Sequence, residues 1–267
     1  MPIDGPEDDK PMPLLDHLIE LRQRLIKALI GFLVVFVVAF YFSEPAFKLL
    51  AAPLEAVTKR PMIVTDLLEG FMSRVKLAAF IAVLVGFPWI AGQLWMFVAP
   101  GLYKKEKAAF FPFLVATPIN FYIGAMIGYM LMPLLWDVLA RYVPDGVNID
   151  AKMNEYVSRV LQLTFAFGFS FELPVLLTLL VRVGMVSTAA LASKRRYAIV
   201  GSFIVAAVLT PPDVASQVAL ALPLIGLYEV SILIGRVIER RKAAAEKAEA
   251  ESAEKAVTSP DEAASTS

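Results

Sequence analysis

The 267-residue sequence contains no cysteine and only one histidine, His17. Without cysteine the chain cannot form disulfides, zinc–thiolate sites or a catalytic thiolate. A single histidine argues against a histidine-based metal centre or a catalytic triad, and the sequence has neither an HExxH motif nor a GxxxxGKS/T phosphate loop. No apolar segment carries a pair of aspartates. We therefore expect no catalytic residues, no metal, no cofactor and no enzymatic activity.

An excess of charge of one sign is also missing, because 25 Lys and Arg residues balance 25 Asp and Glu residues. No basic excess points to a nucleic-acid partner. The first residues, MPIDGPEDDKPM, are acidic and lack the cationic segment and apolar core of a signal peptide. We therefore expect neither a cleavable signal nor a transit peptide.

Apolar residues are what the chain has in excess: 58% of it is hydrophobic and only 19% is charged. A helix needs roughly 20 apolar residues to cross about 30 Å of hydrocarbon. Six runs approach this length, at about 25–43, 77–99, 109–136, 160–181, 197–212 and 215–235. The composition therefore predicts an all-α integral membrane protein with six transmembrane helices.

The fifth run is short. Its sixteen residues, Tyr197 to Pro212, span about 24 Å as a helix. The turn TPPD that follows contains two prolines, which end the helix and favour a tight hairpin. We expect the fifth and sixth helices to form a short pair at one edge of the bundle.

The distribution of basic residues predicts the orientation. With six spans both termini lie on one side, and 17 of the 25 Lys and Arg residues fall there. The positive-inside rule makes this side cytoplasmic. The outer loops, about 44–76 and 137–159, are long enough for short helices. We expect three regions: a cytoplasmic N-terminus with an amphipathic helix (1–24), the membrane domain (25–236) and a charged, partly disordered tail (237–267).

Two carboxylates stand out on the cytoplasmic side. Glu20 lies on the amphipathic helix, four residues before Arg24, and Glu106 lies among lysines in LYKKEK. Both can simply balance charge on a solvated face. Alternatively, the two carboxylates converge and bind a cation such as paired guanidinium groups, whose planar forks match carboxylates. Composition alone leaves both readings open.

Glu172 is a third unusual carboxylate, because it lies inside the apolar segment LTFAFGFSFELPVLLTLLV. A charge at the bilayer centre costs about 2.5–3.5 kcal/mol or more and usually marks function. Glu172 can be protonated, can face water, or can meet a polar group of a partner helix. Pro174 has no N–H, so the carbonyl of Ser170 loses its helical partner and we expect a bend.

Four motifs occur in order along these spans: HLIELRQRL, QLWMFVAPGLYKKEK, FGFSFELPV and LTPPDVASQ. Together they resemble the TatC family of twin-arginine protein translocases, over about residues 13–236. The resemblance implies a six-helix, cup-shaped bundle with a concave face and short fifth and sixth helices. It also implies binding of twin-arginine signal peptides of folded cargo, self-association, single-span partners TatA and TatB, and transport driven by the proton-motive force.

The resemblance also assigns residues by position. Glu20 and Glu106 match the carboxylates that recognise the arginine pair, with Arg22 and Phe97 as neighbours that shape the site. Glu172 matches an intramembrane carboxylate of the concave face. The remaining matches are partner-docking residues at the edge of helices five and six, Thr210 and Gln217, and outer-face residues sensitive to change, Pro53 and Asp213. Polar residues at such a hairpin can instead satisfy backbone groups.

Other classes of function remain open. The lone Glu172 also suits a proton-coupled small-solute transporter, although we detect no internal repeat of the kind such transporters usually contain. A membrane-protein insertase would bind apolar segments regardless of arginine, so dependence on arginine separates it from a twin-arginine receptor. An intramembrane protease lacks its catalytic groups here.

Overall fold

The structure is a computed structural model that describes residues 14–58, 62–98, 111–144, 147, 150–209 and 214–258. Regular structure in these ranges is helical, apart from one isolated parallel β-bridge between Ile63 and Lys152. The helices are α1 (Leu14–Tyr41), α2 (Ser43–Thr58), α3 (Leu67–Val98), α4 (Phe111–Met130), α5 (Met132–Ala140), α6 (Met153–Ser170), α7 (Leu173–Val183), α8 (Thr188–Ser193), α9 (Arg195–Leu209) and α10 (Val214–Thr258). This confirms the predicted all-α class.

Five helical segments within the described ranges are long and apolar enough to cross a membrane: Leu15–Tyr41, Leu67–Val98, Phe111–Val138, Met153–Val183 and Ser216–Ala245. They correspond to the first four predicted spans and the sixth. The fifth predicted span is α9, whose 15 residues give a length of about 22 Å. The expectation of a short fifth helix is therefore confirmed: α9 ends at Leu209, shortly before two consecutive prolines in the sequence.

The sixth predicted span does not end where its apolar residues end. α10 runs for 45 residues, from Val214 to Thr258, so the span continues directly into the charged sequence that follows it. Alanine and charged residues alternate in this extension, and both favour helix where packing does not decide. Residues 241–245 are exposed, as expected of a solvated helix.

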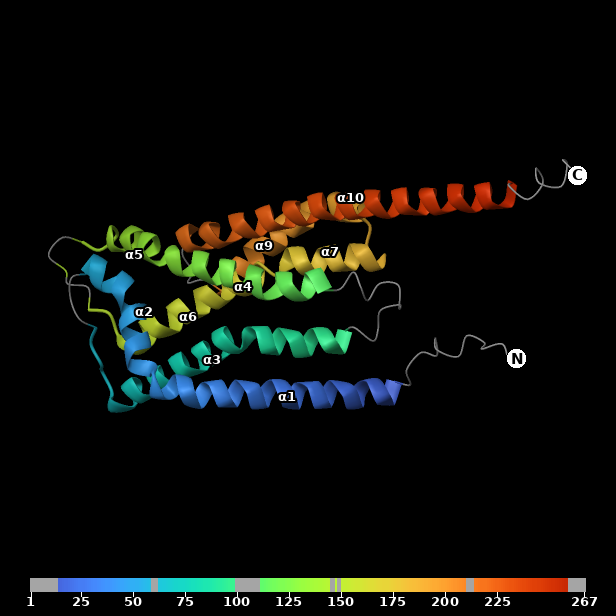
Figure 1. Cartoon of the computed structure of the whole chain (residues 1–267). Helices are drawn as coiled ribbons and strands as arrows, with labels where there is room; N and C mark the ends of the chain where they lie inside the picture. The colour runs from blue at the N-terminus through green and yellow to red at the C-terminus, as the bar shows by residue number, and fades with distance from the viewer. Residues whose placement is uncertain are drawn as a thin grey trace, which may run out of the picture. The chain divides into compact units, whose positions relative to one another are not determined.

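The helices form two compact units, residues 1–165 and 166–267, with the boundary inside α6. In the first unit α1 and α3 run side by side, and α3 also packs on α4 (Figure 1). Phe87 of α3 stacks on Phe121 of α4 with ring centroids 3.7 Å apart. Phe80 of α3 meets Phe165 of α6 at 4.7 Å. Aromatic packing therefore joins α4 and α6 to α3.

Prolines inside the spans leave carbonyl groups without their helical donor, and tyrosines supply a replacement. A proline at position i cannot donate to the carbonyl at i−4. Pro88 lies inside α3, and the hydroxyl of Tyr122 donates to the Leu84 carbonyl at 2.9 Å. This contact satisfies a group that hydrocarbon cannot.

Pro53 follows the same rule. It is buried inside α2, and the hydroxyl of Tyr129 donates to the carbonyl of Leu49, four residues before it, at 2.7 Å. α2 lies in the predicted outer loop 44–76, so the short helix expected there is present. α5 instead comes from the end of the predicted third span. The helix is interrupted at Leu131, between α4 and α5, because Pro133 has no N–H to donate to the carbonyl four residues before it.

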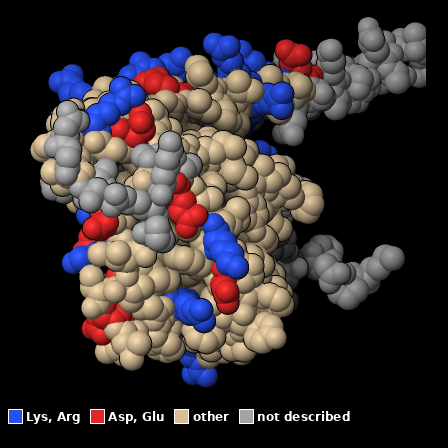
Figure 2. Space-filling view, turned by 90° about the vertical axis from the view of Figure 1, so that its left-hand side faces the viewer, with Lys and Arg blue, Asp and Glu red and all other residues tan. Residues whose placement is uncertain are grey.

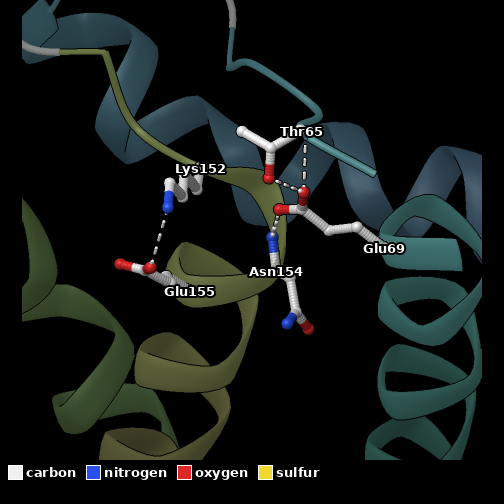
Figure 3. Close-up of polar contacts among 5 residues, drawn as sticks. All are labelled: Thr65, Glu69, Lys152, Asn154 and Glu155. Carbon is white, nitrogen blue, oxygen red and sulfur yellow. Dashed lines mark hydrogen bonds and ion pairs between the residues drawn. The ribbon is translucent and has the colours of Figure 1, made fainter. Parts of the chain in front are cut away.

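The N-terminal end of α3 joins two loops through one carboxylate. Glu69 accepts hydrogen bonds from the Thr65 N–H and hydroxyl, both at 2.7 Å, and from the Asn154 N–H at the start of α6 at 2.9 Å (Figure 3). Beside it Ile63 pairs with the 151–153 backbone in the β-bridge. Glu69 therefore caps α6, although it belongs to α3.

These donors fix the ionisation of Glu69. The residue precedes Lys76, after which α3 is uncharged, so it lies outside the part of α3 that spans hydrocarbon. Hydrogen bonds from the Asn154 N–H and from Thr65 lower the pKa of Glu69 from 4.5 to about 2. A lowered carboxyl pKa stabilises the fold above pH 4.5, and that contribution disappears as the pH falls towards 2.

At this end of the first unit basic residues have acidic neighbours. Figure 2 shows basic and acidic side chains interspersed among uncharged residues on this face. Three exposed ion pairs are Lys48–Glu44 at 3.8 Å, Arg141–Asp137 at 2.7 Å and Lys152–Glu155 at 3.7 Å. Such pairs each add little stability, but they balance the local charge.

In the second unit α7, α8 and α9 all contact α10. Val181 of α7, Leu191 of α8 and Ile232 of α10 form its buried apolar cluster. The hydroxyl of Tyr228 in α10 donates to the Leu191 carbonyl at 2.8 Å. α10 is therefore the helix against which α7, α8 and α9 all pack.

We expect Tyr122→Phe to lower the thermal unfolding temperature of the purified protein, because it leaves the Leu84 carbonyl without a donor at a cost of about 0.5–2 kcal/mol. Pro88→Ala restores an N–H for that carbonyl, so the Tyr122 change should cost much less in the Pro88→Ala background. Tyr41→Phe, at an exposed tyrosine, is the control. Equal losses in both backgrounds would contradict this pairing.

We expect Glu69→Gln to speed hydrogen–deuterium exchange of the Thr65 and Asn154 amides, because the neutral side chain cannot accept all three hydrogen bonds as strongly. Glu155→Gln, which removes only an exposed ion pair, should leave both amides protected. In the wild-type protein the protection, corrected for intrinsic rates, should be the same at pH 7 and pH 5, since Glu69 stays ionised. Loss of protection at pH 5 would show that the carboxylate titrates much higher.

Candidate functional site

The N-terminal half of α1 lies against the C-terminal end of α3 through a repeating set of contacts. The His17 ring stacks on Phe97 with centroids 4.3 Å apart and planes inclined by 19°. Nη1 of Arg24 lies 3.5 Å from the sulfur of Met96. Gly31 contacts Trp89 one further repeat along α1. Positions 17, 24 and 31 are seven apart, which keeps one face of a helix on its neighbour.

Gly31 and Trp89 set the closest approach of the two helices. The indole N–H of Trp89 donates to the Lys27 carbonyl at 3.0 Å. A Cβ at position 31 would lie 2.5 Å from the indole Cδ1 and Nε1. Only glycine therefore fits under the ring, and the hydrogen bond fixes the register of α1 on α3.

Glu20 lies between the His17 and Arg24 contacts on α1. Its carboxylate meets Nη2 of Arg24 at 3.3 Å, and the side chains are 23% and 26% exposed, respectively. An i, i+4 pair of this kind contributes only a few tenths of a kcal/mol. Glu20 is therefore a partly exposed carboxylate that lies between two contacts of α1 with α3. Its ion pair with Arg24 is weak.

The other expected members of this site are placed differently. Phe97 lies at this site, because its ring stacks on His17. Arg22 is exposed and lies on another side of α1 from Glu20. Glu106 lies outside the described residues. The sequence pattern indicated the Glu20–Arg24 pair but missed His17, Met96 and Trp89, because contacts more than sixty residues apart leave no signal in local spacing.

Glu172 lies at the break between α6 and α7. α6 ends at Ser170 and α7 begins at Leu173, with Pro174 in its first turn, so the expected bend is confirmed. The Glu172 N–H donates to the Phe169 carbonyl at 3.1 Å, and its carbonyl accepts from Leu176 at 2.9 Å. The side chain is half-buried.

At the α9–α10 hairpin, Gln217 is half-buried and its amide donates to the Phe203 carbonyl of α9 at 3.2 Å. This contact fits the alternative that polar residues here satisfy backbone groups. Thr210 and Asp213 lie outside the described residues. Among the residues that are described, no group of three or more His, Cys, Asp or Glu side chains can hold a metal ion.

Apolar spans, a surface carboxylate seated between helices α1 and α3, and a carboxylate at a break in a span define a multi-pass helical membrane protein. Comparison with known proteins specifies it further. A family model described as Sec-independent protein translocase protein (TatC) matches residues 16–223. The chain therefore belongs to the TatC family, and it is a transport component of the twin-arginine translocase system rather than an enzyme.

Individual relatives agree. The chain is 43% identical over 240 residues to the Sec-independent protein translocase protein TatC of Magnetococcus marinus, covering 89% of each chain. It is 40% identical over 227 residues to TatC of Escherichia coli K12, covering 84% of this chain and 88% of the relative. A crystal structure of the twin arginine translocase receptor TatC superposes with a TM-score of 0.76 at 36% identity, covering 84% of this chain and 99% of that one.

We expect Gly31→Ala to lower the thermal unfolding temperature, because the added methyl displaces the Trp89 indole from the Lys27 carbonyl at a cost of about 1–3 kcal/mol. Trp89→Val makes room, so the double variant should be more stable than the sum of the single changes predicts. Gly92→Ala is the matched control in α3, since a Cβ there meets nothing within 4 Å. Additive effects at positions 31 and 89 would contradict the contact.

Proposed function

We propose that this chain is the receptor subunit that recognises twin-arginine signal peptides, with Glu20 and Glu106 as the recognising carboxylates. The observation that carries this proposal is the setting of Glu20. It is held at the α1–α3 seam between the His17–Phe97 stack and the Arg24–Met96 contact. Its present partner is a guanidinium group, which is the chemistry that an arginine of the signal would bring.

In this proposal Glu20 exchanges its ion pair with Arg24 for an ion pair with an arginine of the signal peptide. The pairing within α1 is weak because both side chains are partly exposed and pay entropy to stay together. A signal arginine offers a planar fork that can bind a carboxylate with two parallel hydrogen bonds. A second arginine would use Glu106 in the same way. Lysine presents a single ammonium group and cannot reproduce the fork.

Glu172 would act on the apolar part of the signal. A carboxylate at a break between two half-span helices disturbs the surrounding lipid and attracts water. We propose that the signal lies beside Glu172 once it enters the membrane, or that a polar residue of a partner helix meets it there. The bend at Pro174 supports this, since it interrupts the span at the carboxylate.

Partner helices of the TatA and TatB type would dock at the α9–α10 hairpin, near Thr210 and Gln217. The support is the surface of α9, a short helix with several exposed apolar side chains, among them Ile199, Val200, Ile204, Val205 and Val208. A span of about 22 Å leaves the bilayer mismatched, and association with other helices relieves mismatch. Gln217 fixes the hairpin through Phe203.

We also propose an orientation in the membrane, a self-association and an energy source for transport. Both termini would be cytoplasmic in a bacterial inner membrane, because the basic residues concentrate on their side. Copies of the chain would associate in a receptor complex, and the proton-motive force would drive transport. Pro53 and Asp213 would lie on the outer face, where Pro53 holds α2 through the Tyr129 contact.

The test is binding of a labelled twin-arginine peptide to the purified protein in nanodiscs, compared with a Lys-Lys peptide. We expect the Lys-Lys peptide to bind at least about tenfold more weakly, or about 1.4 kcal/mol, because it lacks the planar fork. Glu20→Gln and Glu106→Gln should each remove most of this preference. Asp16→Asn, one turn from Glu20 on the same helix, should retain it.

A photo-crosslinking residue at position 172 should capture the apolar part of the bound Arg-Arg peptide. If both peptides bind alike and the glutamates have no effect, the protein binds apolar segments without reading arginine, as an insertase would. If the preference persists but position 172 captures nothing, the role of Glu172 is wrong and the recognition site stands.

A further inference from the structure

A second charged region lies in the second unit, where the α8–α9 turn meets α10. It contains six exposed basic residues, which we call the α8–α10 basic cluster: Lys194, Arg196, Arg236, Arg240, Arg241 and Lys242. Within the described part of the chain, none of these six makes an ion pair. In the first unit, by comparison, Lys48, Arg141 and Lys152 each have an acidic neighbour.

The acidic residues at this place are already engaged inside the unit. Both oxygens of Glu229 accept from Arg195, at 2.6 Å from Nε and 2.9 Å from Nη2. Glu239 accepts from the Thr188 N–H at 2.8 Å and from its hydroxyl. Between 184 and 245 the sequence has only one other acidic residue, Asp213, which is distant from Arg236 in the sequence and lies outside the described residues.

Helix geometry places two members of the cluster, Arg236 and Arg240, on one side of α10. Arg236 and Arg240 follow Glu229 by seven and eleven residues, which on an α-helix is the same face within about 20°. Glu229 points to Arg195 at the start of α9, so Arg236 and Arg240 lie on the side of α10 that faces the α8–α9 turn. Lys194 and Arg196 flank Arg195 in that turn.

The contact between α8 and α10 holds this arrangement. A Cβ at Gly235 would lie 2.7 Å from the Thr188 side chain, so the two helices approach closely there. Glu239 bonds Thr188 one turn further along α10. The basic side chains are therefore carried by elements fixed to one another, not by a loose loop.

The depth along α10 matches a phospholipid headgroup. About 20 residues from Val214 cross the hydrocarbon, which ends near residue 233. Arg236 and Arg240 lie about 4 and 10 Å beyond that point. The headgroup layer is about 5–7 Å thick on each side of the hydrocarbon, so Arg236 lies at the level of the lipid phosphates. Arg240 lies just beyond this layer, and its long side chain can extend back to it.

We propose that the α8–α10 basic cluster binds the headgroup of an anionic phospholipid, with Lys194, Arg196, Arg236 and Arg240 as its phosphate ligands. Guanidinium groups bind phosphate oxygens through two parallel hydrogen bonds. A zwitterionic headgroup would also bring an ammonium group, and the two carboxylates described beside the cluster, Glu229 and Glu239, already have partners. The site therefore selects a net negative headgroup, such as that of phosphatidylglycerol.

This site is separate from the Glu20 region and goes beyond the proposed recognition of signals. The test uses the purified full-length protein in detergent, titrated with phosphatidylglycerol or phosphatidylethanolamine of identical acyl chains and followed by native mass spectrometry. We expect the wild-type protein to bind phosphatidylglycerol at least about tenfold more tightly, since each surface cation strengthens binding of anionic lipid severalfold. The change K194Q/R196Q/R236Q/R240Q should abolish this preference.

The matched control removes four exposed cations of the first unit, Lys48, Arg141, Lys152 and Arg159, by the same change to glutamine, and should retain the preference. If the quadruple variant of the cluster does not fold, R236Q/R240Q alone should still lose a large part of it. An unchanged preference in the cluster variants overturns the proposal. Equal losses in cluster and control variants also overturn it, because they show only general charge attraction.

Two further measurements identify the ligand. Inorganic phosphate in large excess should not displace the bound lipid. Displacement would show a site for soluble phosphate instead and would overturn the lipid assignment. The Arg-Arg peptide should bind the cluster variant as it binds the wild type, so failure of the lipid site and failure of the signal site give different results.

Discussion

The absence of water in the hydrocarbon is the constraint on which this structure depends. Every backbone N–H and C=O inside the bilayer needs a partner from the protein. Helices supply most partners, but this chain places prolines inside its helices, in the span α3 and in the shorter α2. The side chains that compensate are specific: Tyr122 for the carbonyl freed by Pro88, and Tyr129 for the carbonyl freed by Pro53. The same requirement explains why Gln217 turns its amide to Phe203.

Once backbone groups are satisfied, close contacts decide the positions of the helices. Gly31 allows the Trp89 ring to reach the Lys27 carbonyl, and that contact sets the register between α1 and α3. Register determines which side chains meet at the end of α3. His17 therefore lies on Phe97 and Arg24 on Met96, with Glu20 between them. A packing contact further along α1 and α3 thereby positions the carboxylate.

The carboxylates of this protein differ in the hydrogen bonds and ion pairs that their neighbours give them. Glu69 caps a helix from another part of the chain, and Glu239 binds the start of α8. Glu229 is held by a bidentate arginine. Glu20, in contrast, has only a weak neighbour on its own helix. We propose that a structural carboxylate differs from one that recognises a ligand in how strongly the protein already satisfies it.

Much of this protein follows from its sequence. Apolar runs of about 20 residues have no stable state in water except burial or a bilayer, so the spans and the all-α class are determined locally. The turn after α9 and the break at Pro174 also follow, because proline removes a donor wherever it stands. The four motifs identify the family, and with it Glu20 as a residue of interest.

Only the tertiary structure decided which groups meet. Nothing in local spacing links Trp89 to Lys27, Tyr129 to Leu49 or Glu69 to Asn154, since each contact forms only after separate helices have packed. The length of α10 beyond its apolar part is likewise not determined by local sequence, because a solvated alanine-rich segment favours helix only weakly. The sequence by itself determined the helices and their breaks, whose causes are local. The tertiary structure decided the partners of the polar groups, because a partner depends on the register between helices distant in the chain.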